Sequence, residues 1–514
     1  MKLLRSLTAV SGFTLGSRIF GFFRDVLTAS LLGTGAAADA FVVALKLPSL
    51  LRRLLAEGAF NAAFVPMYAG LLTKEGKDSA NSFAQEVLSV FVVCLMVIVV
   101  VAELFMSWLV PVFVPGFAAT PERMELAIAY SRITFPFILF ISLTALYSGI
   151  LNSFERFAAA ASSPMAGNIF VIGFVMAMSV VITDSGVLLA GAITGCGVVQ
   201  LLWVLIPAYR SGSGLKLLVP KLTPRVRKLL KRMAPVALGS GVHQFNVVIG
   251  TLIASILPVG GISYLYYAER LNQLPLSVIG TAMSTVLLPL LAKSIRAGRH
   301  EEAKVMQNQG IELSMLLTVP AMIGLVILAE PLVKMLYERG AFDAEAAQQT
   351  SYALMAFSIG LPAYVLTKIF DTSFYAQEDT VTPLKIAGIA VLVDIVLSVI
   401  LIKSMQHIGI ALATAASAWL NVFLLGYMLN RRNFLNITER LTRFSFGLIV
   451  ATASTAGVLL YLKPRVMDMI VDGGTQRIAA VCMLVASGLI TYIVTAHMLG
   501  ILNFKELKNQ FKGQ

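Results

Sequence analysis

The chain consists of long apolar runs separated by short polar or charged stretches. Helices of about 20 apolar residues are long enough to cross a membrane. Fourteen such segments are predicted, with approximate bounds of 4–31, 36–72, 80–111, 123–152, 158–182, 187–209, 226–257, 262–292, 305–329, 346–376, 382–402, 408–429, 441–462 and 476–499. The second segment is long and contains Pro48 beside charged residues, which predicts a kinked or broken helix there.

The composition supports this interpretation and excludes several classes of protein. Of the 514 residues, 58% are apolar and only 13% are charged, and the mean hydropathy is +0.83. Soluble domains carry about 25% charged residues and cannot bury so large an apolar share. A water-soluble enzyme, a disordered protein and a coiled coil are therefore excluded. The fold class expected is an all-α polytopic membrane protein with about 14 transmembrane helices.

The distribution of positive charge predicts the orientation of the chain in the membrane. The net charge is +13, and eight Lys or Arg residues fall within residues 210–232 alone. Loops rich in Lys and Arg stay in the cytoplasm, so both ends are expected on the cytoplasmic side of the membrane. A solvated loop close to anionic membrane lipids accounts for this basic run, and no nucleic acid partner is expected.

The basic loop also divides the chain into predicted parts. These are an N-lobe of six helices (1–209), a basic cytoplasmic linker (210–232), a C-lobe of six helices (233–430) and two final helices with a cytoplasmic tail (431–514). The seventh helix is predicted to begin either at 233, after the linker, or near 226, within it. Short sequence similarities recur between the halves at an offset of about 220 residues, which suggests parallel repeats. Two such lobes can rock around a central cavity, as alternating access requires.

Ionisable residues inside predicted spans are the candidates for function, because burying a charge in a membrane is costly. The basic ones are Arg18, Arg24, Lys46, Arg52, Arg53, Arg132, Arg270 and Lys368. The first two spans hold five of them against three acids, Asp25, Asp39 and Glu57. Arg offers a planar, permanently charged fork that matches phosphate oxygens, so this surplus predicts a phosphorylated substrate.

Spacing predicts which of these charges pair within a helix. Arg18 and Asp25 are seven residues apart and can face the same side, and Arg53 can pair with Glu57 along the helix. An alternative for Arg18 and Arg24 is an interfacial position with the charged group in water. Arg52 and Arg53 could instead lie at the cytoplasmic end of a shortened second span. Asp371 and Asp394 are isolated acids in the second half, suited either to ion or proton coupling or to structural hydrogen bonding.

The sequence contains no motif for cofactor binding or for ATP hydrolysis by the protein itself. It has no GxxxxGK[ST] loop and no HExxH motif, and its three Cys and four His residues are scattered. No cofactor and no metal are therefore expected, and no enzymatic activity. The membrane potential or an ion gradient remains as the energy source.

Three stretches resemble a known family closely. They are SRIFGFFRD (17–25), ADAFVVALKLPSLLRRLLAEGAFNAAFVP (38–66) and YYAERLNQLP (266–275), and they resemble the MurJ (MviN) family of lipid II flippases. The likeness extends over nearly the whole chain and includes the fourteen-span count. This family belongs to the same superfamily (MOP) as the MATE multidrug exporters. The resemblance implies a transporter for lipid II, the undecaprenyl-pyrophosphate-linked precursor of peptidoglycan, and so a role in cell-wall synthesis and cell shape.

By motif position, the resemblance also implies which residues bind the substrate. The family's essential charged positions fall on Arg18, Arg24, Asp39, Arg52 and Arg270, and neighbouring cavity positions fall on Ser17, Arg53 and Glu57. Membrane lipids, and peptidoglycan synthesis enzymes as protein partners, are the remaining expectations. The seventh span has no acidic residue, although some sodium-binding relatives carry one there, which argues against sodium coupling through that span.

Three rival functions share part of this evidence. A flippase for another undecaprenyl-linked glycan would have the same physical features. A drug or cation exporter of the MATE type would need surplus acid in its cavity, which is the reverse of what the first two spans contain. A membrane scaffold for cell-wall enzymes would have no need for arginines at membrane depth.

Overall fold

The computed structural model describes residues 2–53, 59–435, 439–467 and 474–502. In these ranges the chain is helical, and the only β-type pairing is an isolated bridge between Arg339 and Phe342. The chain forms two compact units. The first contains Met1–Ser263 with Arg339–Phe342, and the second contains Tyr264–Glu338 with Asp343–Gln514.

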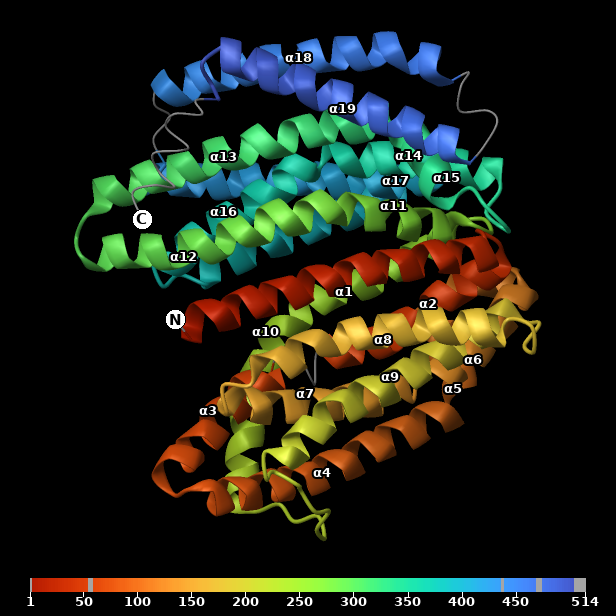
Figure 1. Ribbon diagram of the computed structural model, residues 1–514, viewed down its shortest axis with the longest axis vertical. Helices are drawn as coiled ribbons and strands as arrows, with labels where there is room; N and C mark the ends of the chain where they lie inside the picture. Colours follow the sequence, from red (N-terminus) through yellow and green to blue (C-terminus); the bar gives the residue numbers. More distant parts are fainter. Residues whose placement is uncertain (1, 54–58, 436–438, 468–473, 503–514) are drawn as a thin grey trace. The chain divides into compact units, whose positions relative to one another are not determined.

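Ten α-helices and a short 3-10 helix make up the described part of the first unit (Figure 1). They are α1 (Lys2–Leu32), α2 (Ala36–Leu51), α3 (Ala59–Lys74), α4 (Lys77–Leu104), α5 (Met106–Phe113), η2 (Pro115–Ala119), α6 (Pro121–Thr134), α7 (Phe137–Ser153), α8 (Phe157–Met178), α9 (Ser185–Arg210) and α10 (Pro224–Ala254). Helix α1 packs on α8, α2 packs on α6, and α9 packs on both α7 and α8.

An aromatic cluster forms the core of the first unit near the α3–α4 connection. Phe60 stacks on Phe64 and on Phe91 with ring centroids 5.0 and 4.8 Å apart, and Phe64 stacks on Phe83. Stacked rings add to the stabilisation that burial of their apolar area provides. This cluster joins α3 to α4, and its contacts with α7, α9 and α10 extend the core across the unit.

The second unit is also all-helical in its described residues. Its elements are α11 (Gly261–Pro275), which begins in the first unit, η3 (Leu276–Gly280), α12 (Thr281–Arg296), α13 (His300–Ile327), α14 (Ala329–Tyr337), α15 (Ala344–Ile359), α16 (Leu361–Ala376), α17 (Val381–Arg431), α18 (Glu439–Met467) and α19 (Thr475–Met498). Helix α16 packs on α12, α13 and α17, and the last two helices, α18 and α19, lie side by side (Figure 1).

Each of the fourteen predicted segments coincides with a helix or with consecutive helices, which confirms the all-α polytopic fold class. Segments 382–402 and 408–429 both lie in α17, and the expected break between them occurs at Gln406, whose φ is 48°. Segment 36–72 corresponds to α2 and α3, and Pro48, near which a kink or break was expected, lies inside α2. Residues 54–58, between the two helices, are outside the described residues.

Ten stretches of the described residues are long and apolar enough to cross a membrane. The whole of α17 counts once among them, and α1, α2, α3 and α10 are not included. Charges interrupt the apolar run of α1 at Arg18, Arg24 and Asp25, and basic residues crowd the start of α10. The helices outside the ten stretches thus include α1 and α2, which carry Arg18, Arg24 and Asp39, whereas Arg270 lies within one of the ten.

The position of α10 bears on the predicted division of the chain. Helix α10 packs on α3 and belongs to the first compact unit, which extends to Ser263. The predicted division into 1–209, 210–232, 233–430 and 431–514 came from charge and sequence repetition, and it stays a prediction. The loop before α10 is held against α4, since Leu218 N donates to Ser89 Oγ at 2.7 Å and Thr223 Oγ1 donates to Glu86 Oε2 at 2.6 Å.

Close backbone approach within the first unit predicts an effect of substitution at Gly116. Its N–H donates to Ser255 Oγ at 3.0 Å, and a Cβ atom at this position would overlap the backbone of Ser255 and Ile256. We expect Gly116→Ala to destabilise the protein by about 1–3 kcal/mol, the usual cost of overpacking. Thermal unfolding of the purified protein in detergent measures this.

Gly173→Ala is the matched control, because nothing lies within 4 Å of a Cβ built at that position in α8. It should leave the melting temperature unchanged or raise it slightly, since Ala favours a helix more than Gly does. Equal melting temperatures for the two variants would contradict the close approach at Gly116.

A carboxylate in the loop between α16 and α17 predicts a pH dependence. Asp379 accepts hydrogen bonds from Thr382 Oγ1 (2.6 Å) and Thr382 N (2.9 Å), and Arg432 Nη2 lies 2.7 Å away. These interactions, those from Thr382 foremost, hold the pKa of Asp379 well below its usual range. Its stabilising effect is therefore present at neutral pH and disappears as the pH falls below the unfolded-state pKa of about 3.9.

We expect Asp379→Asn to lower the melting temperature at pH 7, and this difference from the wild type should shrink as the pH is lowered through 4. A difference that is constant between pH 7 and pH 3.5 would contradict the ionised state of Asp379.

Candidate functional site

The first group of site residues lies where α1 packs against α8. Arg24 donates through Nη2 to Asp25 Oδ1 at 2.8 Å and through Nη1 to Asn168 Oδ1 at 3.1 Å. Asn168 Nδ2 donates in turn to the backbone oxygen of Ser17 at 3.1 Å. Asn168 therefore fixes both the guanidinium of Arg24 and the backbone next to Arg18, and sequence analysis did not single it out.

Arg18 differs from Arg24 in its surroundings. It is exposed, and no hydrogen bond or ion pair involves its side chain among the described residues. Spacing suggested that Arg18 and Asp25 face the same side, but the partner that Asp25 takes is Arg24. Arg18 thus retains its hydrogen-bond donors for another partner.

Asp39 lies at the centre of a fully buried polar network. Its carboxylate accepts hydrogen bonds of 2.8 Å from Gly260 N, Ser263 N and Ser263 Oγ. Arg123, at the start of α6, forms an ion pair with Asp39 at 3.1 Å, and both side chains are at most 2% exposed. The network ties α2 and α6 to the turn between α10 and α11.

Arg123 also contacts Leu257 and Phe117. Its Nη1 donates to Leu257 O at 3.0 Å, and its guanidinium lies over the ring of Phe117 with 4.0 Å between Cζ and the ring centroid. A buried charge pair of this kind persists only when hydrogen bonds compensate for the lost hydration. Sequence analysis missed Arg123 because it stands next to Glu122 at a predicted helix start, where loop charges are common.

The second half of α2 carries the next charged residues. Lys46 Nζ donates to Thr251 Oγ1 of α10 at 3.1 Å. Arg52 is half-buried and Arg53 is exposed, and both lie just beyond the end of α2. Glu57, the expected partner of Arg53, lies outside the described residues, so that expected ion pair stays a prediction.

In the second unit, residues of its own helix position Arg270. Its Nη2 donates to Tyr266 Oη at 3.2 Å and its Nη1 to Gln273 Oε1 at 3.4 Å, and its Cζ lies 4.8 Å from the ring centroid of Tyr266. Gln273 is oriented in turn by Glu269, to which its Nε2 donates at 2.7 Å. Arg270 is half-buried.

The two isolated acids of the second unit are in different surroundings. Asp394 accepts a hydrogen bond of 3.3 Å from Thr414 Oγ1, which lies in the second half of α17. Asp371 on α16 is half-buried, and no hydrogen bond to its carboxylate is present among the described residues. His, Cys, Asp and Glu residues form no group of three that could hold a metal ion in the described part of the chain.

The arrangement divides the predicted site residues by what they are able to do. Asp39 is held in a compensated network and serves to fix helices, whereas Arg18 and Arg53 are exposed cations. Arg24 is oriented by the amide oxygen of Asn168, and Arg270 by the oxygens of Tyr266 and Gln273. Oriented guanidinium groups in an apolar helical protein provide sites for phosphate-like anions.

The fold is shared with a solved membrane transporter. A solved "multidrug resistance MATE family transporter of the MOP superfamily" in its inward-facing conformation superposes with a TM-score of 0.67. It is 15% identical, and the match covers 81% of this chain and 94% of that one. At this identity the likeness establishes the fold alone.

Closer relatives define the family. Residues 28–495 match the family "Lipid II flippase MurJ". A "Probable lipid II flippase MurJ" of Rhizobium tropici is 39% identical over 518 residues, covering 100% of this chain and 97% of the relative. A solved "Lipid II flippase MurJ, inward closed conformation" is 27% identical with a TM-score of 0.78, covering 95% of this chain and 98% of that one. The chain belongs to the MurJ family.

The buried ion pair predicts a strong effect of removing one partner. We expect Arg123→Leu to destabilise the protein by about 3–5 kcal/mol, because the carboxylate of Asp39 would stay buried without its counter-charge. Thermal unfolding of the purified variant in detergent measures this, and Arg132→Leu on the same helix is the control. Arg132 is exposed and makes one hydrogen bond, to Ser107 Oγ at 3.2 Å, so its loss should matter little.

A double-mutant cycle separates the ion pair from simple loss of packing. Arg123→Leu combined with Asp39→Asn should cost less than the sum of the two single changes, because residues in contact do not contribute independently. Strict additivity of the two effects would show that the pair is not coupled.

Proposed function

We propose that the protein translocates lipid II, the undecaprenyl-pyrophosphate-linked precursor of peptidoglycan, from the inner to the outer leaflet of the bacterial cytoplasmic membrane. The observation that carries the proposal is membership of the MurJ family over almost the full length. It is supported by the arginines of α1, α2 and α11, since a pyrophosphate group is the anion that several guanidiniums together recognise best. The protein is on this account a transporter and not an enzyme.

Arg18, Arg24, Arg52 and Arg270 are proposed to bind the pyrophosphate. Arg18 has hydrogen-bond donors available. Arg24 is oriented by Asn168 and Asp25, and Arg270 is oriented by Tyr266. Their contribution is electrostatic and geometric, and it requires no chemical change in the substrate.

The remaining site residues are proposed to support these arginines. Ser17 and Arg53 are neighbouring cavity residues, and Asp39 and Glu57 orient the arginines as the protein changes state. The network around Asp39 suits an orienting role because it fixes α2, which carries Arg52 close to its C-terminal end. Asp371 and Asp394 are the candidates for ion or proton coupling.

Transport is proposed to follow alternating access, with both termini in the cytoplasm. Two helical units that each have their own core are suited to moving as bodies. The positive residues between 210 and 232 favour a cytoplasmic position for that loop. The membrane potential provides about 2.3 kcal/mol per charge per 100 mV, which can drive movement of a charged substrate.

We expect Arg270→Ala to abolish lipid II translocation while the protein still inserts and folds. The loss of a guanidinium that contacts pyrophosphate removes a charge-assisted hydrogen bond of about 1.5–3 kcal/mol, so binding should weaken by tenfold or more. Fluorescent lipid II in proteoliposomes measures both binding and translocation.

Arg299→Ala is the control, since Arg299 pairs with Glu302 at 2.9 Å at an exposed helix start. It should transport as the wild type does. Normal translocation by Arg270→Ala would refute the role given to Arg270, and normal translocation of a different undecaprenyl-linked glycan in place of lipid II would refute the substrate.

A further inference from the structure

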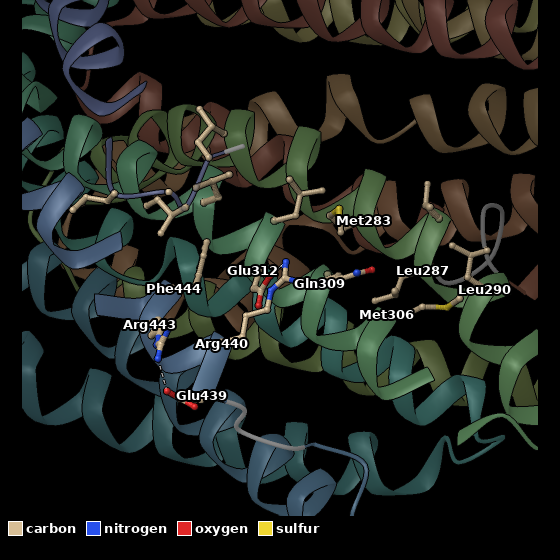
Figure 2. A pocket seen from close by; sticks show the side chains of 18 residues that line it. Met283, Leu287, Leu290, Met306, Gln309, Glu312, Glu439, Arg440, Arg443 and Phe444 are labelled. Atoms are coloured by element: carbon tan, nitrogen blue, oxygen red, sulfur yellow. Dashed lines mark hydrogen bonds and ion pairs between the residues drawn. The ribbon is translucent and has the colours of Figure 1, made fainter. Parts of the chain in front are cut away.

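A pocket of about 710 Å³ lies in the second unit between α12, α13 and α18, close to the end of α19. Its walls are of two kinds (Figure 2). Apolar side chains from α12 and α13, among them Met283, Leu287, Leu290 and Leu313, form one side. Charged side chains at the start of α18, together with Glu312 of α13, form the other. None of these residues belongs to the proposed lipid II site.

The charged side combines two cations with two anions. Arg440 Nη2 contacts Glu312 Oε2 at 3.2 Å, and Arg443 Nη2 contacts Glu439 Oε1 at 2.7 Å. Figure 2 shows the Arg440 side chain reaching toward Glu312, with Glu439 and Arg443 beside it. The described residues that line the pocket therefore carry no net charge, yet they present both signs close together.

Both ion pairs leave hydrogen-bonding capacity unused. The Arg440 side chain is 68% exposed and that of Arg443 is 81% exposed. Each pair uses one guanidinium nitrogen, although an Arg side chain has five N–H donors. Each carboxylate also has a second oxygen that takes no part in its pair. A ligand that carries an anion and a primary ammonium group could therefore bind without breaking either pair.

Apolar surface lies on both sides of the charged cluster along α12 and α13. Leu290 is six residues from the end of α12 and Met306 is six residues from the start of α13, so both lie about 9 Å inside the helix ends. Glu312 is twelve residues, about 18 Å, from the start of α13, and Leu313 and Leu316 lie deeper still. An acyl chain can therefore run from the charged cluster along the apolar wall.

We propose that this pocket binds a membrane phospholipid with a primary-amine headgroup. The phosphate accepts hydrogen bonds from Arg440 and Arg443, and the ammonium donates to Glu439 and Glu312. An acyl chain lies along the apolar wall of α12 and α13. An anionic lipid without an amine would leave the carboxylates unmatched, and a quaternary ammonium has no N–H to donate.

Native mass spectrometry of the full-length protein, purified in detergent and incubated with one lipid at a time, tests the proposal. The probes are phosphatidylethanolamine, phosphatidylcholine and phosphatidylglycerol with identical acyl chains. Phosphatidylethanolamine should bind at least about fivefold better than the other two. Equal binding of all three, or a preference for phosphatidylglycerol, would overturn the proposal.

Variants assign the binding to this pocket. The double change Arg440→Gln and Arg443→Gln should remove the preference for phosphatidylethanolamine. The matched control Arg296→Gln breaks an exposed pair with Glu378 elsewhere in the unit and should leave the preference unchanged. Loss of the preference for phosphatidylethanolamine in both the double variant and the Arg296→Gln control would overturn the assignment.

Substitution of the apolar wall gives a second, independent readout. Leu313→Trp should block the acyl chain and weaken phosphatidylethanolamine binding severalfold, whereas Val305→Trp, on α13 but outside the pocket lining, should not. Inorganic phosphate and undecaprenyl phosphate serve as competitors. Displacement by millimolar inorganic phosphate would show a simple anion site, displacement by equimolar undecaprenyl phosphate would show a site for the substrate tail, and either result would overturn the proposal.

Discussion

The cost of keeping ionised groups among apolar helices constrains the whole structure. A buried carboxylate or guanidinium is tolerated when a counter-charge and several hydrogen bonds replace the water it has lost. The network of Asp39 and Arg123 meets this condition at the carboxylate, with donors from Gly260 and Ser263 and the counter-charge of Arg123, although Nε of Arg123 is buried without a hydrogen-bond partner among the described residues. It fixes three separate parts of the unit through one carboxylate.

The same constraint separates structural charges from those available to a substrate. Arg123 has all its major interactions inside the protein, whereas Arg18 is exposed and has no partner among the described residues. Arg24 and Arg270 are intermediate, because neighbouring side chains orient them without surrounding them. An anion that moves through the membrane needs cations of this second kind, since a fully compensated pair has little left to offer.

Hydropathy was sufficient to predict the helices, and it failed where the roles of polar residues depend on tertiary contacts. The break in α17 at Gln406 was expected from the apolar pattern, and the structure has it. The role of Arg123 was not predictable, because its partner is 84 residues away and no spacing rule connects it to Asp39. Asn168 was missed for the same reason, since its contacts with α1 span 144 and 151 residues. Glu57 lies outside the described residues, and the roles given to the site arginines stay predictions.

The most direct test of the central claim is lipid II exposure on the outer face of the inner membrane. The measurement uses cells depleted of their own flippase that express this protein at normal levels. Restored exposure of lipid II by the wild type is the result that the account predicts. No restoration by a protein that is correctly inserted in the membrane would contradict it and would point to a different polyprenyl-linked substrate.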